Sequence, residues 1–160
     1  VTYYSQTGNT EMLARAIYEA IHVDKELLPL RDVKTTEGYD IILVGFPVQA
    51  HSVPAAVVPF FKNLPAGQPI ALFCTHGSLR GGQFPRQALE NAMGLSSRAR
   101  ILGTFGVRGK VNPKVLDALM KMAEHQTWAE EAQGADGHPD AADLADAKEF
   151  ARMILAKIGH

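Results

Sequence analysis

The apolar run Ile41-Ile42-Leu43-Val44 constrains the fold more than any other stretch of this sequence. It lacks the alternation of a half-exposed strand, and it therefore predicts a strand covered on both faces, as in a parallel sheet. Weaker strand patterns lie before and after it. The expected strands span residues 1–4, 26–30, 40–46, 70–74 and 101–107.

Helical patterns separate these strands. The first is expected over residues 10–21, with one buried face made by Met12, Leu13, Ala16, Ile17, Ala20 and Ile21. Further helices are expected over residues 54–64, 84–95 and 113–132, and from Asp140 onwards. Strands that alternate with helices predict an α/β fold, a doubly wound parallel sheet with right-handed crossovers and helices on both faces. A chain of 160 residues is expected to form one domain, residues 1–160.

A polar turn joins the first expected strand to the first helix, and it reads Ser5-Gln6-Thr7-Gly8-Asn9-Thr10. Gly8 lets the backbone approach a ligand closely, and the first N–H groups of a helix attract an anion because they lack internal partners. No Lys follows Gly8, so the turn is not a nucleotide P-loop. The turn therefore predicts an uncharged cradle for a phosphate monoester; the alternative is an ordinary helix start capped by Asn or Thr.

The pattern Ser5-x-Thr7-Gly8-Asn9-Thr10 after a strand resembles the phosphate loop of flavodoxins, which bind FMN. Residues 39–48, 54–64, 74–77 and 138–140 are similar to later segments of the same family. The resemblance implies five strands in the order 2-1-3-4-5, with the ligand beyond the carboxyl ends of strands 1 and 3. The helix at 113–132 is additional to the shortest flavodoxins, and we expect it to be peripheral.

The resemblance also implies an FMN site built from three loops. The implied cofactor-binding residues are Ser5, Gln6, Thr7, Gly8, Asn9, Thr10, Pro47, Val48, Gln49, Ala50, His51, Thr75, His76, Gly77, Gly81 and Gly82. The two later loops contain no Trp or Tyr, which leaves His51, His76 and Phe84, with Phe46 at the strand end, as candidates to contact the flavin ring. The alternative for each histidine is a surface loop residue that bonds the backbone. Gly45 and Gly77 are interpreted as turn residues.

Charge bears on function in two ways. Lys plus Arg (16) nearly balance Asp plus Glu (17), which argues against binding to nucleic acid or an anionic membrane. The balance also differs from the acidic character common in electron-carrying flavodoxins. Arg80 lies in the third loop. If its guanidinium points at the flavin, it would stabilise the anion of the reduced flavin. If it points to solvent, it would have no redox role.

Other chemistry is not indicated. Cys74 is the only cysteine, so no disulfide within the chain can form, and it is expected to be buried in the core. The histidines lack a metal-ligand spacing, and we expect no metal. No run of about 20 apolar residues predicts a membrane span, and a cytoplasmic location is expected. Trp128 could cover core or a partner surface.

Three functions remain open. The first is an FMN-binding electron-transfer protein that shuttles electrons between redox partner proteins. The second is an FMN-dependent reductase of a quinone or another small electron acceptor. The third is a flavin-free binding module with the same fold. A homodimer is possible in each case.

Overall fold

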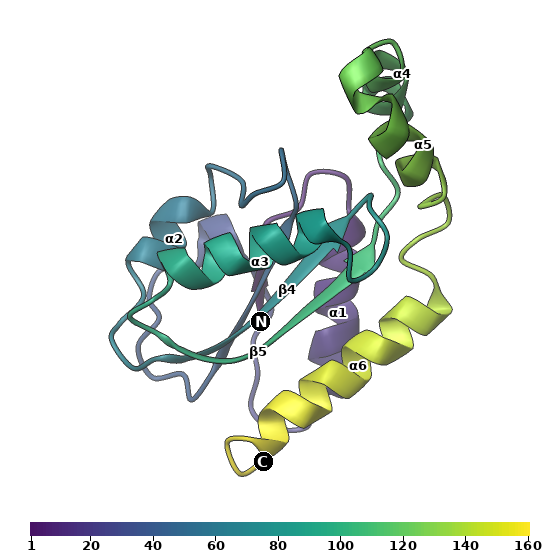
Figure 1. Ribbon diagram of the computed structural model, residues 1–160. Coiled ribbons are helices and arrows are strands. Elements are labelled where there is room, and N and C mark those ends of the chain that lie inside the picture. Colours follow the sequence, from purple (N-terminus) through teal and green to yellow (C-terminus); the bar gives the residue numbers. More distant parts are fainter.

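The computed structural model describes residues 1–160 and contains one five-stranded parallel sheet (Figure 1). The strand order is β2-β1-β3-β4-β5, as the resemblance implied. The strands are β1 Thr2–Tyr3, β2 Leu28–Pro29, β3 Ile42–Pro47, β4 Pro69–His76 and β5 Arg100–Arg108. Three residues of the apolar run, Ile42 to Val44, belong to β3, the central strand of the sheet. The predicted fold class is confirmed.

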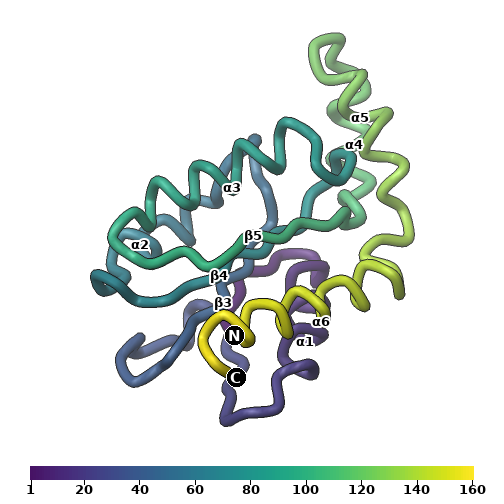
Figure 2. The backbone as a smooth tube through the Cα atoms, turned by 60° about the horizontal axis from the view of Figure 1, so that its bottom comes forward, coloured from purple at the N-terminus to yellow at the C-terminus, as the bar shows by residue number.

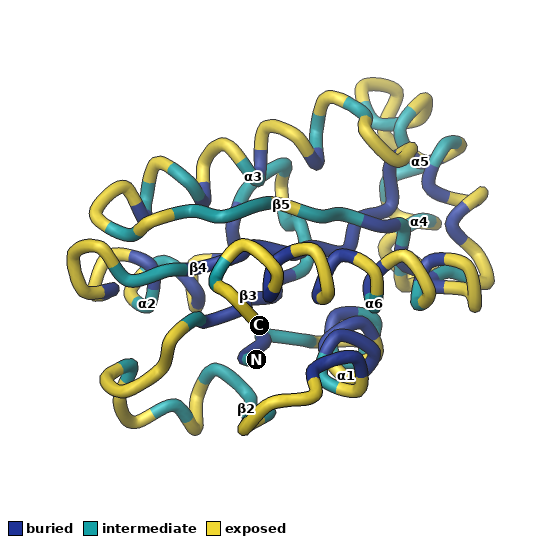
Figure 3. Tube along the Cα trace, turned by 90° about the horizontal axis from the view of Figure 1, so that it is seen from below, coloured by how far each residue is buried: buried dark blue, intermediate teal, exposed yellow.

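Six α-helices connect or follow the strands. They are α1 Asn9–Ala20, α2 Val58–Lys62, α3 Gln83–Leu95, α4 Pro113–Met120, α5 Gln126–Gln133 and α6 Ala141–Ala156. Short 3-10 turns occur at Leu30–Asp32 and Ala123–His125. Seen along the sheet, α3 lies on one side of it, and α1 and α6 lie together on the other (Figure 3). None of these helices is long and apolar enough to cross a lipid bilayer.

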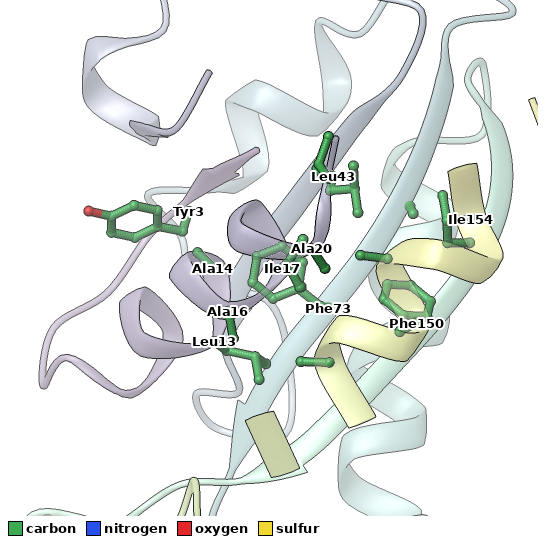
Figure 4. Close-up of a cluster of buried hydrophobic side chains, with 14 of the residues drawn as sticks. Tyr3, Leu13, Ala14, Ala16, Ile17, Ala20, Leu43, Phe73, Phe150 and Ile154 are labelled. Atoms are coloured by element: carbon green, nitrogen blue, oxygen red, sulfur yellow. The ribbon is translucent and has the colours of Figure 1, made fainter. Parts of the chain in front are cut away.

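Two apolar cores fill the space between sheet and helices. On one face Leu13 and Ile17 of α1 pack with Phe73 of β4 and with Phe150 and Ile154 of α6 (Figure 4). On the other face the core joins Phe46, Phe61, Leu64, Leu72, Cys74 and Ala88. Cys74 is fully buried, as expected, and burial raises the pKa of its thiol to about 12. The thiol is therefore core and stays protonated at neutral pH.

Gly45 is a strand residue rather than the predicted turn residue. A Cβ at this position of β3 would lie 2.1 Å from Cε2 of Phe73, whose ring occupies that space. The absence of a side chain at Gly45 therefore lets the Phe73 ring lie against the neighbouring strand.

Two expectations about helices were wrong. Met12 was assigned to the buried face of α1 but is 45% exposed, because the buried stripe runs through Leu13, Ala14 and Ile17 instead. The single helix expected over 113–132 is broken between α4 and α5, since Met122 has an extended backbone with φ −104° and ψ 112°. The two short helices stand out at one end of the molecule (Figures 1 and 2).

Candidate functional site

A cavity of about 820 Å³ lies where the carboxyl ends of the central strands meet. Of the sixteen predicted site residues, those that line it are Gln6, Thr7, Asn9, Thr10, Pro47, Val48, Gln49, Ala50, His51, Thr75, His76 and Gly77. Ser5, Gly8, Gly81 and Gly82 do not line it. Thr75 and His76 belong to the end of β4 rather than to a loop. The three predicted segments are thus brought together at the switch point of the sheet.

The loop of residues 5–10, which we call the phosphate loop after the flavodoxin loop that it resembles, enters α1 without a side-chain cap. Gly8 occupies the N-cap position with a left-handed φ of 92°, and its N–H donates to Ser5 Oγ at 3.1 Å. The expected alternative, an Asn or Thr cap, is not formed. Thr10 Oγ1 bonds Thr75 Oγ1 at 2.8 Å instead, and Asn9 Nδ2 donates to the Lys110 carbonyl at 2.9 Å. The exposed Thr7 and the first N–H groups of α1 are therefore free to bind an anion.

The segment after β3 makes a tight two-residue turn. Gln49 and Ser52 exchange backbone hydrogen bonds of 3.0 and 2.9 Å around Ala50 and His51, whose φ values are 46° and 62°. Such a turn favours Gly or Asn, and each non-Gly residue held there costs about 1–3 kcal/mol. Gln49 Nε2 also donates to Gln6 Oε1 at 2.6 Å, which links this turn to the phosphate loop.

His51 and Phe84 form a flat aromatic surface beside the cavity. Their ring centroids are 3.8 Å apart, with an angle of 20° between the ring planes. Both residues line the cavity and were expected to contact a ring, whereas Phe46, the candidate at the strand end, is fully buried in the core and does not line the cavity. The pair presents a stacked apolar surface of the kind that planar ligands use.

His76, the third candidate, is a buried residue of β4 and not a surface loop residue. Its Nδ1 lies 2.9 Å from the Ser78 carbonyl and therefore carries the proton, while Nε2 has no partner. Burial lowers the pKa of His76 to about 4, and the nearby Arg108 guanidinium contributes in the same direction. His76 is thus neutral at physiological pH, and its expected backbone bond is present.

The segment with α4 and α5 lies at the periphery of the fold, as expected, but it also lines the cavity. It contributes Val111, Asn112, Val115, Leu119, His125 and Trp128. The sequence predicted its apolar stripe but gave no means to tell a stripe that faces a cavity from one that faces the core.

Several polar contacts hold α5 against the segment that follows β4. Trp128 Nε1 donates to Ser78 Oγ at 2.9 Å, and the Leu79 N–H donates to Glu131 Oε1 at 2.6 Å. The Arg108 guanidinium donates to the carbonyls of Glu131 and Gly77 at 2.6 and 3.2 Å. The position of α5 is therefore fixed relative to one of the predicted flavin segments.

Gly77 allows this close approach. A Cβ at Gly77 would lie 2.5 Å from Val111 Cγ2, 3.2 Å from Ala132 Cβ and 3.3 Å from Trp128 Cζ2. Gly77 lies in a bend directly after β4, as its prediction as a turn residue implied, although its φ is not positive. The missing side chain makes room for α5 and for the segment that precedes α4.

Comparison with known proteins fits this geometry. The sequence profile of the flavodoxin domain matches residues 1–152. The chain belongs to the flavodoxin domain family. The flavodoxin-like domain-containing protein BilS of Clostridioides difficile is 25% identical over an alignment 169 residues long, gaps included. The alignment covers 98% of this chain and 96% of BilS.

Solved structures share the fold of this flavodoxin domain. A flavodoxin from the domain Archaea has a TM-score of 0.65 at 19% identity, covering 99% of this chain and 96% of its own. Reduced Megasphaera elsdenii flavodoxin has a TM-score of 0.55 at 24% identity, with coverages of 82% and 94%. A Lactobacillus acidophilus flavoprotein in complex with FMN has a TM-score of 0.51 at 20% identity, with coverages of 66% and 89%.

The lining of the flavodoxin-domain cavity carries no acidic side chain that would repel an anion. No Asp or Glu lines it, whereas Lys110 does, in an ion pair of 2.7 Å with Asp136. Arg80 lies outside the lining; its guanidinium pairs with Asp146 of α6 at 2.5 Å and lies 5.3 Å from the centre of the Phe105 ring. Of the two alternatives for Arg80, the structure therefore supports the one in which its guanidinium points away from the cavity.

One cluster of possible metal ligands lies at the start of α6. His138, Asp140 and Asp143 have ligand atoms within 4.8 Å of one another. Asp140 and Asp143 form a reciprocal capping box, and His138 Nδ1 lies 2.5 Å from Asp143 Oδ2. These bonds cap the helix and account for the cluster.

Proposed function

We propose that this flavodoxin domain binds one FMN non-covalently in the cavity and passes electrons through it. The observation that carries the proposal is the start of α1, which has no side-chain cap and whose first residues, Asn9 and Thr10, line a cavity that no carboxylate lines. A phosphate monoester needs such free N–H donors. When bound, the flavin supplies the redox chemistry, and the protein supplies position and surroundings.

The residues divide into two groups by what each would hold. Thr7 and the backbone of the phosphate loop bind the phosphate. The segments 47–51 and 75–77 hold the ring, with the His51–Phe84 pair as a flat contact. The buried Thr10–Thr75 hydroxyl pair joins the two ends of the site, because it links α1 to the end of β4.

Two activities fit an FMN protein of this shape. The first is electron transfer with a redox partner protein, as in a flavodoxin. The second is reduction of a small acceptor such as a quinone. The apolar side chains of Val115, Leu119 and Trp128 at the cavity favour the second, because a site used only by a protein partner does not need a wall that encloses a small molecule.

The visible spectrum tests both points. The purified protein is mixed with FMN, freed of unbound flavin by gel filtration, and titrated with dithionite. Retained flavin bands are expected. Reduction in two separate one-electron steps would support the carrier, and a single two-electron step would support the reductase. A colourless protein would overturn FMN binding and leave the flavin-free binding module.

A further inference from the structure

Helix α4 exposes apolar side chains that the fold itself does not cover. None of its residues is buried, although Val115, Leu116, Leu119 and Met120 give it an apolar stripe. Val115 is 46% exposed. A short helix in a globular protein normally buries such a stripe, and an exposed one commonly marks a binding site.

Part of this stripe faces the cavity. Val115 and Leu119 are four residues apart and so share one side of α4, and both line the cavity. Val111 and Trp128 also line the cavity, and both lie against Gly77. We call these four residues the apolar wall. The phosphate loop, with Gln6, Thr7 and Asn9, is the polar part of the lining.

The apolar wall is held in place. Trp128 is fixed by its hydrogen bond to Ser78 Oγ, and Val111 lies against the backbone at Gly77. The Lys110 N–H, just before the wall, donates to the His138 carbonyl at 2.8 Å, and the Lys110 carbonyl accepts from Asn9 Nδ2. These bonds tie the wall to the phosphate loop and to the chain before α6.

The cavity is large for a small-molecule site. Its volume of about 820 Å³ lies near the upper end of the range of about 300–1,000 Å³ for small-molecule sites. Its lining contains no carboxylate, which disfavours a cationic ligand, while Lys110 and His125 are compatible with neutral or anionic ones.

We propose that the apolar wall is a second subsite, beside the flavin, that binds a planar apolar small molecule of the quinone class. The proposal rests on the proposed function, because it assumes that FMN occupies the part of the cavity next to the phosphate loop. It assigns to the α4–α5 segment the selection of the small molecule, while the three loops hold the cofactor.

Equilibrium dialysis of the FMN-loaded protein against 2-methyl-1,4-naphthoquinone tests the subsite. Saturable binding is expected, with quenching of the emission of Trp128, the only tryptophan of the chain. The variant Val115→Asn should weaken naphthoquinone binding roughly tenfold, because it replaces an apolar contact in the pocket. Val115 is already largely exposed, so the substitution should leave the fold intact.

Val23→Asn is the matched control. Val23 is 40% exposed and does not line the cavity, so this variant should bind naphthoquinone as the unmodified protein does. Equal losses in both variants, or no saturable binding, would overturn the subsite. Release of FMN on adding naphthoquinone would also overturn it, since the wall would then belong to the flavin site. Failure to retain FMN at the outset would instead overturn the proposed function.

Discussion

Thr7 is the side chain of the phosphate loop that is best placed to report on an anion. It is exposed and lines the cavity, whereas the hydroxyl of Thr10 and the amide of Asn9 are engaged with Thr75 and Lys110. A change at Asn9 would disturb the link to Lys110 as well as any phosphate contact. Thr7 therefore gives the cleaner test.

Thr7→Val should weaken FMN binding by about 1.5–3 kcal/mol, the contribution of one hydrogen bond to a charged group. Thr104→Val is the control, because Thr104 is an exposed residue of β5 that lies outside the cavity lining. Titration of FMN fluorescence with each variant measures the two affinities. Equal affinities would remove Thr7 from the phosphate site.

His76 should make the stability of the protein depend on pH. Below pH 6.5 the unfolded chain takes up a proton at this imidazole that the folded chain does not accept until about pH 4. The free energy of unfolding should therefore fall as the pH drops from 6.5 to 4, by up to about 3 kcal/mol, and show no contribution from His76 above that window.

Urea unfolding at several pH values between 7 and 4 measures this effect. His76→Asn is the comparison, because its amide can still donate to the Ser78 carbonyl but does not titrate. The variant should lose less stability across the window than the unmodified protein. Identical pH profiles would mean that His76 is accessible to protons in the folded state.

At the scale of elements, the packing of α5 against the end of β4 depends on Gly77. Gly77→Ala should destabilise the protein by about 1–3 kcal/mol, because the added Cβ overlaps Val111 and crowds Trp128. The emission of Trp128 should shift to longer wavelength as the indole becomes more exposed to water. Chemical unfolding followed by tryptophan fluorescence measures both quantities.

Gly94→Ala is the control for that variant. A Cβ at Gly94 of α3 meets no atom within 4 Å, and the position is exposed. Alanine there should leave stability unchanged or raise it by up to about 1 kcal/mol, since glycine is a poor helix former. A Gly77→Ala variant as stable as Gly94→Ala would show that α5 can move away from the end of β4 without loss of stability.

The central strands and the glycine turn that enters α1 could be predicted from local pattern alone. The run Ile41 to Val44 predicts a strand covered on both faces, and the turn around Gly8 precedes an amphipathic helix. Both signals lie within a few residues of the feature that they predict. The strand order came from the family resemblance, because pairing between distant strands leaves no local signal.

The α4–α5 segment could not be predicted in the same way. Lys121, Met122 and Ala123 are good helix formers, so helix propensity does not account for the break at Met122. The apolar stripe of α4 predicted a buried face, but only the fold shows that part of it faces the cavity. The role of Gly77 was hidden for the same reason, since Val111 and Trp128 are distant in sequence.

For the molecule as a whole, the arrangement separates two kinds of surface around one cavity. The sheet brings the phosphate loop and the ends of β3 and β4 together at one edge, and the α4–α5 segment closes that edge from another side. The near balance of charge over the chain leaves no acidic excess, and the cavity itself has no carboxylate. This suits a bound phosphate more than it suits electrostatic docking of a basic partner.

The affinity of the protein for FMN and for riboflavin, measured side by side by calorimetric titration, tests the central claim most directly. The two ligands share the ring and differ in the phosphate. FMN should bind roughly a hundredfold more tightly or better, because two hydrogen bonds to a charged group contribute about 3–6 kcal/mol. Equal affinities, or no binding of either ligand, would contradict a phosphate site at the start of α1.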